Sequence, residues 1–366
     1  MTRVAMSGAG GFLGWHTRAA LRETGVEVNS LRVGDSFDLA QATAAIEGTS
    51  RAVHIAGVNR ASDEDVLVGN LVFAEQFASA VRAATTPPPI IVYANSTQVG
   101  NGSVYGQAKE RAAETLIKAA ADVGAVFIDV CLPNLFGEHG RPFYNSVSAT
   151  FSHLLAKGAE PTIDHDKQLV LLHAQNAADV LTGVAHLDSM KGLEQVETVS
   201  GLLGRLRGLA ETYRAGEIPS IAERFDRELF NTYRSFLFPE HAPIRLSRHA
   251  DVRGSFFEIV RSHGGAGQSS FSTTVPGVTR GDHFHRRKIE RFTVLQGRAR
   301  ISLRRLFCDE VISFVVSGDA PVAIDMPTMW SHSITNVGDE ILYTSFWTND
   351  IFDPENPDTI AEAVIA

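Results

Sequence analysis

The sequence predicts two domains of different class, an α/β domain with a parallel sheet followed by an all-β domain. Strand-like and helical patterns alternate over the first ~130 residues, which is typical of a parallel sheet with helices on both faces. Beyond about residue 245, short strand-like runs punctuated by Gly and Pro follow one another instead. The length of 366 residues suits roughly two domains of ordinary size.

The α/β pattern opens with a strand and then alternates regularly. The predicted strands are Arg3–Ser7, Glu27–Leu31, Ala52–Ile55, Ile90–Ala94 and Val126–Leu132. The predicted helices are Phe12–Thr24, Leu39–Ile46, Val66–Thr85 and Tyr105–Val123. From about 150 to 236 the pattern is mostly helical, with one more short strand over Val170–His173. We expect this last stretch to carry the substrate side of the same domain.

The proline-containing stretch Phe238–Pro243 marks the change from one pattern to the other. We therefore expect an α/β domain over 1–237, a linker over 238–245 and an all-β domain over 246–366. The predicted strands of the second domain are Ser255–Val260, Ser269–Val275, Glu290–Leu295, Ala299–Leu303, Val311–Val316, Val322–Asp325, Ser331–Asn336 and Glu340–Trp347. This pattern favours a β-barrel or jelly roll. The residues from Phe352 onward are expected to form a peripheral tail.

Composition narrows the class of partner. A net charge of −9 argues against nucleic acid or an anionic membrane as the main partner. No apolar run approaches the ~18 residues of a transmembrane helix, so membrane insertion is not expected. The two cysteines, Cys131 and Cys308, make neither a disulfide framework nor a cysteine-based zinc site. We expect a cytoplasmic protein.

A glycine-rich turn joins the first predicted strand to the first predicted helix. Gly8, Gly11 and Gly14 are spaced so that the backbone can turn tightly and approach a pyrophosphate. The helix that opens at Phe12 and Leu13 then offers free N–H groups and the positive end of its dipole. The turn therefore predicts a dinucleotide site of Rossmann type.

The end of the second strand indicates which dinucleotide binds there. An acidic residue at this place suits the ribose 2′-OH of NAD, whereas an arginine suits the 2′-phosphate of NADP. Arg32 stands at this point and Asp35 follows three residues later. We interpret Arg32 as favouring NADPH.

Tyr105 and Lys109 form a YxxxK motif at the start of a predicted helix. The spacing puts both side chains on one helical face, beside the strand ends where the cofactor crevice opens. A nearby ammonium favours tyrosinate, so Tyr105 is a candidate to exchange a proton with a substrate oxygen. Ser96, just past the fourth strand, is placed to hydrogen-bond the same oxygen. We take Ser96, Tyr105 and Lys109 as candidate catalytic residues, and Tyr105 and Lys109 also as candidate cofactor-binding residues.

At these residues the first domain resembles the extended short-chain dehydrogenase/reductase family. The matching features are the glycine turn, His54-Ile55-Ala56-Gly57, Ser96, the Tyr105/Lys109 pair and Leu132-Pro133-Asn134-Leu135-Phe136-Gly137. The resemblance implies that His54 lies at the cofactor and Asn134 beside a sugar nucleotide. Two features depart from the family pattern: only eight residues separate Ser96 from Tyr105, and Cys131 stands where Arg is common.

The second domain carries a cluster of potential metal ligands. His283 and His285 point to one side of a strand, Glu290 follows on the next strand, and His332 comes from a later one. This mixture of imidazole and carboxylate suits zinc or another divalent first-row metal. The pattern resembles the two motifs of the cupin family, although Met329 stands where Gly is common.

The whole sequence resembles the CapF family of bifunctional capsular polysaccharide synthesis enzymes. Further matching stretches are His54–Arg60, Pro133–Gly137, Tyr144–Val147, Asp251–Phe256, Pro276–Gly281, Phe352–Pro354 and Pro357–Thr359. The resemblance implies a UDP-linked 2-acetamido-4-keto-6-deoxy sugar as substrate, bound in part by Asn134 and Asn145. It implies C3 epimerisation by the cupin domain and NADPH-dependent reduction of the C4 ketone by the reductase domain. The product would be UDP-N-acetyl-6-deoxy-talosamine, on the route to UDP-N-acetyl-L-fucosamine, made by a homodimer.

Three other functions stay open from the sequence. The chain could be a 4-keto reductase whose cupin domain is purely structural. It could also be an NAD-dependent sugar-nucleotide epimerase or dehydratase that recycles one bound NAD. A non-catalytic sensor of a dinucleotide and a sugar is the third, although a mere binder has no need for the Tyr105/Lys109 pair. The residues also leave open whether the metal is catalytic or structural and which group is the base of the cupin domain.

Overall fold

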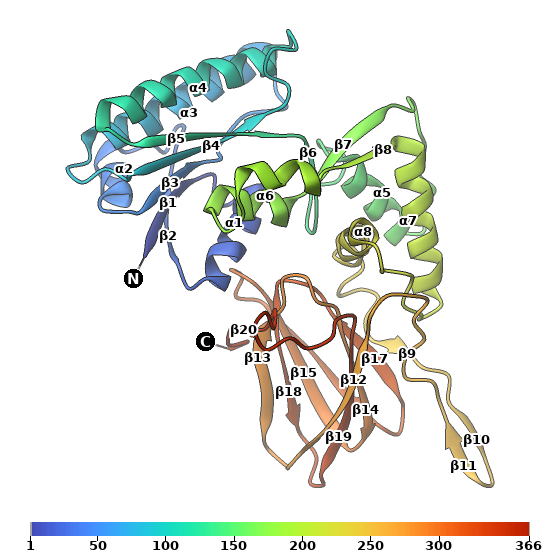
Figure 1. Cartoon of the computed structure of the whole chain (residues 1–366). Helices are drawn as coiled ribbons and strands as arrows, with labels where there is room; N and C mark the ends of the chain where they lie inside the picture. The colour runs from blue at the N-terminus through green and yellow to red at the C-terminus, as the bar shows by residue number, and fades with distance from the viewer. Residues whose placement is uncertain (1, 366) are drawn as a thin grey trace. The chain divides into compact units, whose positions relative to one another are not determined.

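A computed structural model describes residues 2–365, which form two compact units (Figure 1). Unit 1 holds the residues up to Phe136 together with Gly140–Ser146 and Lys167–Thr198, and unit 2 holds the remainder. A parallel Rossmann-like α/β sheet in unit 1 and antiparallel sheets in unit 2 confirm the predicted fold class. The predicted domain boundaries at 237 and 246 stay a prediction, because the compact units follow a different division of the chain.

Unit 1 is built on a five-stranded parallel sheet of order β2-β1-β3-β4-β5. Its strands are β1 (Arg3–Ser7), β2 (Glu27–Leu31), β3 (Arg51–His54), β4 (Ile90–Ser96) and β5 (Val126–Leu132). All five predicted strands are thus present, with ends that differ by two residues at most. Because β2 and β3 flank β1 on opposite sides, the strand order reverses at β1 and β3, and sheets of this class usually bind ligands beyond the carboxyl ends of such strands.

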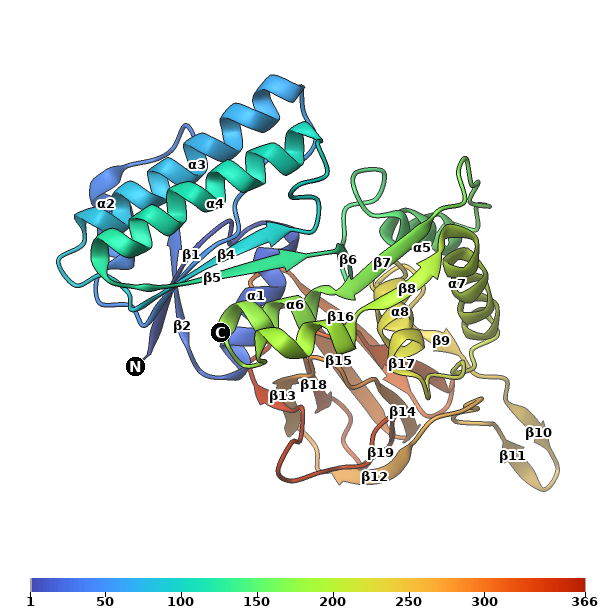
Figure 2. The ribbon, with the colours of Figure 1, turned by 45° about the horizontal axis from the view of Figure 1, so that its top comes forward.

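Helices cover both faces of this sheet, as Figures 1 and 2 show. The helices α2 (Leu39–Ile46), α3 (Asp63–Ala83) and α4 (Val104–Val123) cover one face, and α1 (Phe12–Glu23) and α6 (Ala174–Thr182) cover the other. Alternate residues of each strand face opposite cores, so that Tyr93 packs with Phe77 and Leu116 while Val92 packs with Leu13. Among residues 2–365, no helix is both long and apolar enough to cross a bilayer.

Unit 1 also contains a small three-stranded sheet, of which the sequence predicted only the middle strand. It consists of β6 (Asn134–Phe136), β7 (Gln168–His173) and β8 (Gln195–Thr198), and a 3₁₀ helix over Leu187–Leu193 precedes β8. Strands of three and four residues are too short to show a period-2 pattern, which is why β6 and β8 were missed.

Unit 2 is a sandwich of two five-stranded antiparallel sheets with three helices, α5 (Val147–Ala156), α7 (Val199–Arg214) and α8 (Arg224–Arg234). One sheet has the order β12-β19-β14-β17-β9 and the other β16-β15-β18-β13-β20. Their strands are β9 (Ile244–Arg245), β12 (Gln268–Thr274), β13 (Thr279–Phe284), β14 (Glu290–Gln296), β15 (Arg298–Arg305), β16 (Val311–Ser317), β17 (Val322–Met326), β18 (Trp330–Asn336), β19 (Leu342–Thr348) and β20 (Ile360–Ala361). Residues from both sheets, such as Phe292 and Ile301, share one apolar core.

A separate hairpin of β10 (His249–Asp251) and β11 (Gly254–Phe256) precedes the sandwich. The sequence predicted a longer strand, Ser255–Val260, at this place. The predicted linker residues also contribute to the sandwich, because Phe238 packs against its core and β9 pairs with β17.

A buried ion pair ties the helices of unit 2 to its sheets. The Arg291 guanidinium donates to both Asp325 carboxylate oxygens at 2.6 and 2.9 Å, and the Tyr213 hydroxyl of α7 donates to Asp325 at 2.8 Å. Burial opposes charge on Asp325, yet Arg291 outweighs it and holds the pKa of this carboxyl below its usual value. The pair fixes α7 against β14 and β17.

Candidate functional site

The glycine-rich turn lies at the carboxyl end of β1, where the predicted dinucleotide site should be. A Cβ on Gly14 would stand 2.0 Å from the Gly8 carbonyl oxygen, so only glycine permits this close approach of helix and turn. The helix α1 begins after Gly11 with no side chain capping it. The N–H groups of its first turn, from Phe12 and Leu13 onward, are therefore available to a pyrophosphate.

His54 helps to hold the glycine-rich turn in place through Ser7, the residue that precedes the turn. The Ser7 hydroxyl oxygen accepts hydrogen bonds from the N–H groups of Ile55 and Ala56 at 3.1 and 3.3 Å and lies 2.8 Å from His54 Nδ1. Burial lowers the pKa of His54 to about 3, so the ring is neutral and accepts the Ser7 proton. Because the residue is only 1% exposed, its ring contributes by holding the turn. Direct contact of His54 with a cofactor stays a prediction.

Arg32 directly follows β2 and is exposed, as a residue that meets a ribose phosphate should be. The loop that follows Arg32 is held by the side-chain amide of Gln76 in α3. Its oxygen accepts from the Gly34 N–H at 2.6 Å, and its NH₂ group donates to the Gly34 carbonyl at 3.2 Å. The loop is therefore ordered without any contribution from the Arg32 side chain.

Ser96 ends β4, and Tyr105 and Lys109 lie in the first two turns of α4. The Ser96 hydroxyl accepts from the Gln98 N–H at 3.2 Å, which leaves its proton available to a ligand. A Cβ on Gly106 would stand 2.3 Å from the Gln98 carbonyl oxygen, so glycine lets the loop fold directly onto α4. This packing accommodates the short separation of Ser96 and Tyr105 in the sequence.

Lys109 is buried under the sheet edge, with 3% of its surface exposed. Its ammonium donates to the Ala94 carbonyl at 2.6 Å and lies 4.2 Å from the centre of the Tyr93 ring. Burial lowers the pKa of Lys109 to about 7, although Asp129 and Cys131 favour the charged form.

The protonation state of Tyr105 differs from our expectation. Sequence reasoning predicts that the ammonium of Lys109 favours tyrosinate, but burial raises the pKa of Tyr105 above its ordinary value. The Lys109 ammonium is directed to Ala94, so it does not offset that burial. Tyr105 is therefore a neutral phenol, which is the form that donates a proton to a developing alkoxide.

Asp129 and Asn95 are polar residues beneath this site that sequence reasoning missed. Asn95 donates to Asp129 at 3.0 Å from the neighbouring strand. Burial raises the pKa of Asp129, and Asn95 and Lys109 partly offset this. Its second oxygen has no hydrogen-bond partner among the described residues. The alternation of Asp129 and Cys131 along β5, on the face that α4 covers, was the available signal.

The buried ammonium predicts a pH-dependent cost in stability. Since the folded pKa of about 7 lies below the ordinary lysine value of 10.5, the unfolded chain binds more protons between these values. The cost, on the order of 5 kcal/mol, is fully present below pH 7 and fades as the pH rises towards 10. We expect Lys109→Met to melt at a higher temperature than the parent at pH 6, with the gap narrowing by pH 10.

Thermal melts from pH 6 to 10 without cofactor, followed by circular dichroism, check this prediction. Lys118→Met, which removes an exposed lysine from the same helix, is the control and should show no such trend. A gap between Lys109→Met and the parent that is constant with pH would contradict the burial argument.

The two asparagines predicted to meet the substrate both lie in unit 1. Asn134 is exposed in β6 and donates to the Val170 carbonyl at 3.1 Å. Asn145 is exposed in the loop before α5. Nearby, the Tyr144 hydroxyl donates to Asn59 at 2.8 Å and Arg60 donates to the Tyr144 carbonyl, which fixes this loop. The roles of both asparagines stay predictions.

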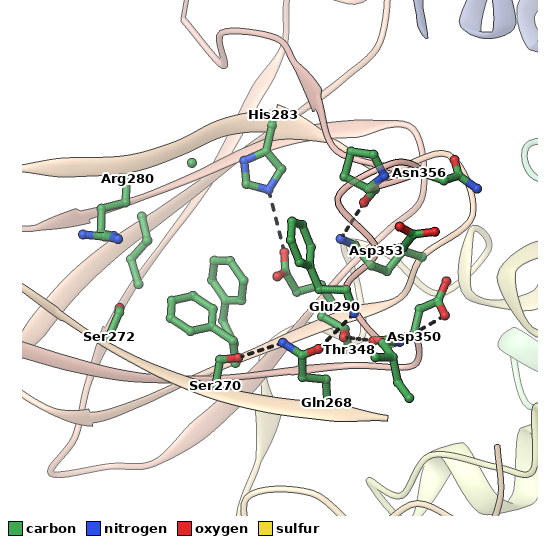
Figure 3. A pocket seen from close by; sticks show the side chains of 18 residues that line it. Gln268, Ser270, Ser272, Arg280, His283, Glu290, Thr348, Asp350, Asp353 and Asn356 are labelled. Carbon is green, nitrogen blue, oxygen red and sulfur yellow. Dashed lines mark hydrogen bonds and ion pairs between the residues drawn. The ribbon is translucent and has the colours of Figure 1, made fainter. Parts of the chain in front are cut away.

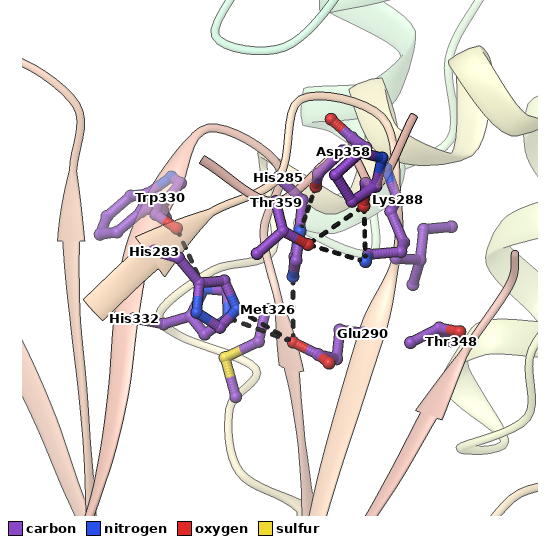
Figure 4. Close-up of polar contacts among 12 residues, drawn as sticks. His283, His285, Lys288, Glu290, Met326, Trp330, His332, Thr348, Asp358 and Thr359 are labelled. Atoms are coloured by element: carbon purple, nitrogen blue, oxygen red, sulfur yellow. Dashed lines mark hydrogen bonds and ion pairs between the residues drawn. The ribbon is translucent and has the colours of Figure 1, made fainter. Parts of the chain in front are cut away.

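In unit 2 the structure brings the four predicted metal ligands together. His283 lies in β13, His285 directly follows it, Glu290 begins β14, and His332 lies in β18. One potential ligand atom from each lies within 4.8 Å of all the others (Figure 4). Glu290 Oε2 is 3.1 Å from His285 Nε2, 3.2 Å from His332 Nε2 and 4.0 Å from His283 Nε2.

A β-bulge at Asp282 directs the side chain of His283, in β13, toward this cluster. Asp282 has a positive φ of 58°, and the pairing register shifts so that His283 stands opposite His332 while Arg280 stands opposite Ile334. His332 and Ile334 share the inner face of β18, so Arg280 and His283 both face inward although two residues, Gly281 and Asp282, lie between them.

The hydrogen bonds of the cluster suit a cation at its centre. His285 Nδ1 lies 2.5 Å from the Asp358 carbonyl and His332 Nδ1 lies 3.2 Å from the Trp330 carbonyl, while both Nε2 atoms approach the Glu290 carboxylate. A neutral imidazole has one N–H and cannot donate on both sides. With both Nδ1 protons directed at carbonyls, the Nε2 lone pairs face inward, as in zinc sites.

The charge state of the cluster agrees with this arrangement. Burial opposes charge on Glu290, but its contacts with the three neighbouring imidazoles outweigh burial and hold the pKa of its carboxyl well below the usual range. Burial lowers the pKa of His332 to about 4. A carboxylate among imidazoles fits zinc or another divalent first-row metal.

A cavity of about 360 Å³ opens beside the cluster (Figure 3). The ionisable side chains that line it are Arg280, His283, Lys288, Glu290, Asp350 and Asp353. No tyrosine is among the described residues that line it, so the base that the sequence left open is sought among the other ionisable groups of the cavity. Residues from Ile351 to Pro357 form part of the wall, and β20 pairs with β13. The expected peripheral tail is therefore wrong, because these residues close the cavity.

Together these features define a Rossmann-like α/β unit, with a glycine-rich turn and a Tyr-Lys pair at one edge of its sheet, joined to an antiparallel β unit with a candidate metal centre. The chain is 31% identical, over 99% of both chains, to UDP-2-acetamido-2,6-beta-L-arabino-hexul-4-ose reductase of Pseudomonas aeruginosa. It is 28% identical to the capsular polysaccharide assembling protein CapF of Staphylococcus aureus, with a TM-score of 0.61 and coverage of 99% and 100%. The chain belongs to the CapF family, which includes both proteins.

Other matches cover parts of the chain. Residues 249–360 match the polysaccharide biosynthesis C-terminal domain. A putative epimerase from Burkholderia cenocepacia, 14% identical with a TM-score of 0.51, covers 64% of this chain and 98% of its own, which shows the fold alone. A further CapF structure, 26% identical over 99% of this chain and 100% of its own with a TM-score of 0.54, was solved with the inhibitor 3-isopropenyl-tropolone.

Proposed function

We propose that this protein converts a UDP-linked 2-acetamido-4-keto-6-deoxy sugar in two steps. The β domain epimerises C3, and the α/β domain reduces the C4 ketone with NADPH to give UDP-N-acetyl-6-deoxy-talosamine, on the route to UDP-N-acetyl-L-fucosamine. The observation that carries the proposal is the placement of Ser96, Tyr105 and Lys109 at the same sheet edge as the glycine turn. The printed activity of the Pseudomonas relative names a sugar of this class.

In the reduction, NADPH supplies the hydride and the chain supplies the proton. The neutral Tyr105 phenol donates its proton to the C4 oxygen as the carbonyl becomes an alkoxide. Ser96 donates a second hydrogen bond to the same oxygen, and Lys109 offers positive charge beneath it. Arg32 would meet the 2′-phosphate, and the N–H groups at the start of α1 the pyrophosphate.

In the epimerisation, the ketone acidifies the neighbouring C3–H, so a base removes this proton and an acid returns one to the other face. Lys288 is the candidate proton carrier of the cavity, because His283 and Glu290 would be occupied as metal ligands. A divalent cation held by His283, His285, Glu290 and His332 would supply Lewis-acid polarisation of the ketone.

The inhibitor bound by CapF supports a metal-dependent step. Tropolones carry adjacent carbonyl and hydroxyl oxygens and chelate divalent metals. A change in the visible spectrum of the cobalt-loaded protein when 3-isopropenyl-tropolone is added would support the metal centre, and an unchanged spectrum would count against it. A homodimer and a cytoplasmic location belong to the same proposal, and the dimer is testable by light scattering.

The decisive assay offers NADPH with a panel of UDP-linked 4-keto sugars and identifies the products by NMR. The proposal predicts one NADPH oxidised per sugar, together with inversion at C3. An enzyme that recycles a bound NAD would consume no NADPH. A pure 4-keto reductase would oxidise NADPH and leave C3 unchanged.

A further inference from the structure

The segment Pro357–Thr359 contacts the turn that joins two of the metal ligands (Figure 4). The turn Arg286–Lys288 connects His285 to the strand that begins with Glu290. One oxygen of the Asp358 carboxylate accepts from the Arg286 N–H at 2.9 Å. The other accepts from the N–H groups of Arg287 and Lys288 at 2.8 and 2.7 Å. Three consecutive amides of the turn therefore converge on one carboxylate.

The main chain of the same residue holds a metal ligand directly. The Asp358 carbonyl oxygen lies 2.5 Å from His285 Nδ1, on the side of the ring opposite Glu290. Lys288 adds two further hydrogen bonds between the turn and the segment. Its ammonium donates to the Pro357 carbonyl and to the Thr359 hydroxyl, both at 3.1 Å. The ring and the turn thus share one support, although His285 and Asp358 are 73 residues apart.

We propose that Asp358 is a positioning residue of the metal centre: its carbonyl fixes the ring and the proton of His285, and its carboxylate fixes the turn between His285 and Glu290. This inference rests on the proposed metal site. A carbonyl that accepts the Nδ1 proton leaves the Nε2 lone pair free for the metal, and loss of such an outer partner typically weakens metal binding about 10–100-fold.

The residue at position 358 meets two separate requirements: its backbone adopts a positive φ, and its side chain supplies a carboxylate. Asp358 has a positive φ of 41°, which Asp, Asn and Gly adopt more readily than other residues. Asparagine keeps the size and the backbone preference but offers one acceptor oxygen and an NH₂ group, which opposes an amide N–H. Asp358→Asn therefore tests the carboxylate, whereas Asp358→Gly removes it and relaxes the backbone.

The test measures zinc affinity by competition with a chelator, and the visible spectrum after loading with cobalt. We expect Asp358→Asn and Asp358→Gly to bind zinc about 10–100-fold more weakly than the parent. We also expect a changed cobalt spectrum and faster hydrogen exchange at the amides of 286–288. Asp353→Asn is the matched control, because Asp353 accepts a backbone N–H from Glu355 in the same segment but does not contact His285. Its zinc affinity should equal that of the parent.

The possible results separate this inference from the proposed function. A parent protein that binds no zinc would overturn the metal site and this inference with it. A parent that binds zinc and an Asp358→Asn variant of equal affinity would overturn the inference alone. If the Asp358 variants fail to fold, Lys288→Gln loosens the same segment more gently. We expect it to weaken zinc binding, and unchanged affinity there would also count against the proposal.

Discussion

Replacing Tyr105 by phenylalanine should slow NADPH-dependent reduction of the 4-keto sugar by about 10²–10⁴-fold, the usual effect of losing a positioned general acid. In the proposed mechanism the phenol protonates the C4 oxygen, and burial, which raises the pKa of Tyr105, favours the neutral form that donates this proton. The Ser96 hydroxyl still offers a hydrogen bond but is a far weaker acid. NADPH oxidation followed at 340 nm measures the loss.

The same variant should keep the other properties of the protein. In the proposed site, NADPH binding rests mainly on the glycine turn and the start of α1, which the substitution leaves intact. Tyr343→Phe removes a hydroxyl group of the same kind from β19 in unit 2 and should reduce the ketone at the parental rate. Full reductase activity in Tyr105→Phe would overturn the role of the phenol.

Removing a metal ligand should have a comparably large effect on the chemistry at C3. His283 is the best choice for this, because its side chain is 22% exposed and truncation leaves no sealed hole in the core. Loss of an outer-shell partner typically lowers metal affinity or activity about 10–100-fold, and loss of a direct ligand should lower it at least as much. We therefore expect His283→Ala to lose zinc and to lose C3–H exchange by at least about 10²-fold.

The controls for this variant separate the two halves of the reaction. His165→Ala removes an exposed histidine from unit 2 and should leave zinc content and exchange unchanged. A sugar that already has the inverted C3 should be reduced by His283→Ala at the parental rate. Parental exchange in metal-free His283→Ala would assign the metal a structural role.

Local patterns made most of the fold predictable. The buried parallel strands of unit 1 are short apolar runs bounded by turn residues, and all five appear where the pattern places them. Short strands that form only by pairing with other strands were missed, namely β6, β8, β9, β10 and β20. At two to four residues each, they carry no periodicity of their own.

The same contrast holds for the sites. Tyr105 and Lys109 share a helical face, and His283, His285 and Glu290 are close in sequence, so spacing alone groups them. Asp129 reaches Asn95 only through strand pairing, and Asp358 reaches His285 only after the chain returns across the sandwich. Such partners have no fixed spacing. The protonation of Tyr105 was mispredicted for a related reason, since burial is a property of the folded chain.

The central claim is that two separate sites in one chain act on neighbouring carbons of the same sugar. Incubation of the 4-keto sugar nucleotide in D₂O without NADPH, followed by proton NMR of the C3 position, tests it most directly. We expect the parent and Tyr105→Phe to exchange C3–H equally fast, and His283→Ala to lose this exchange. Exchange that is lost in Tyr105→Phe and kept in His283→Ala would contradict it.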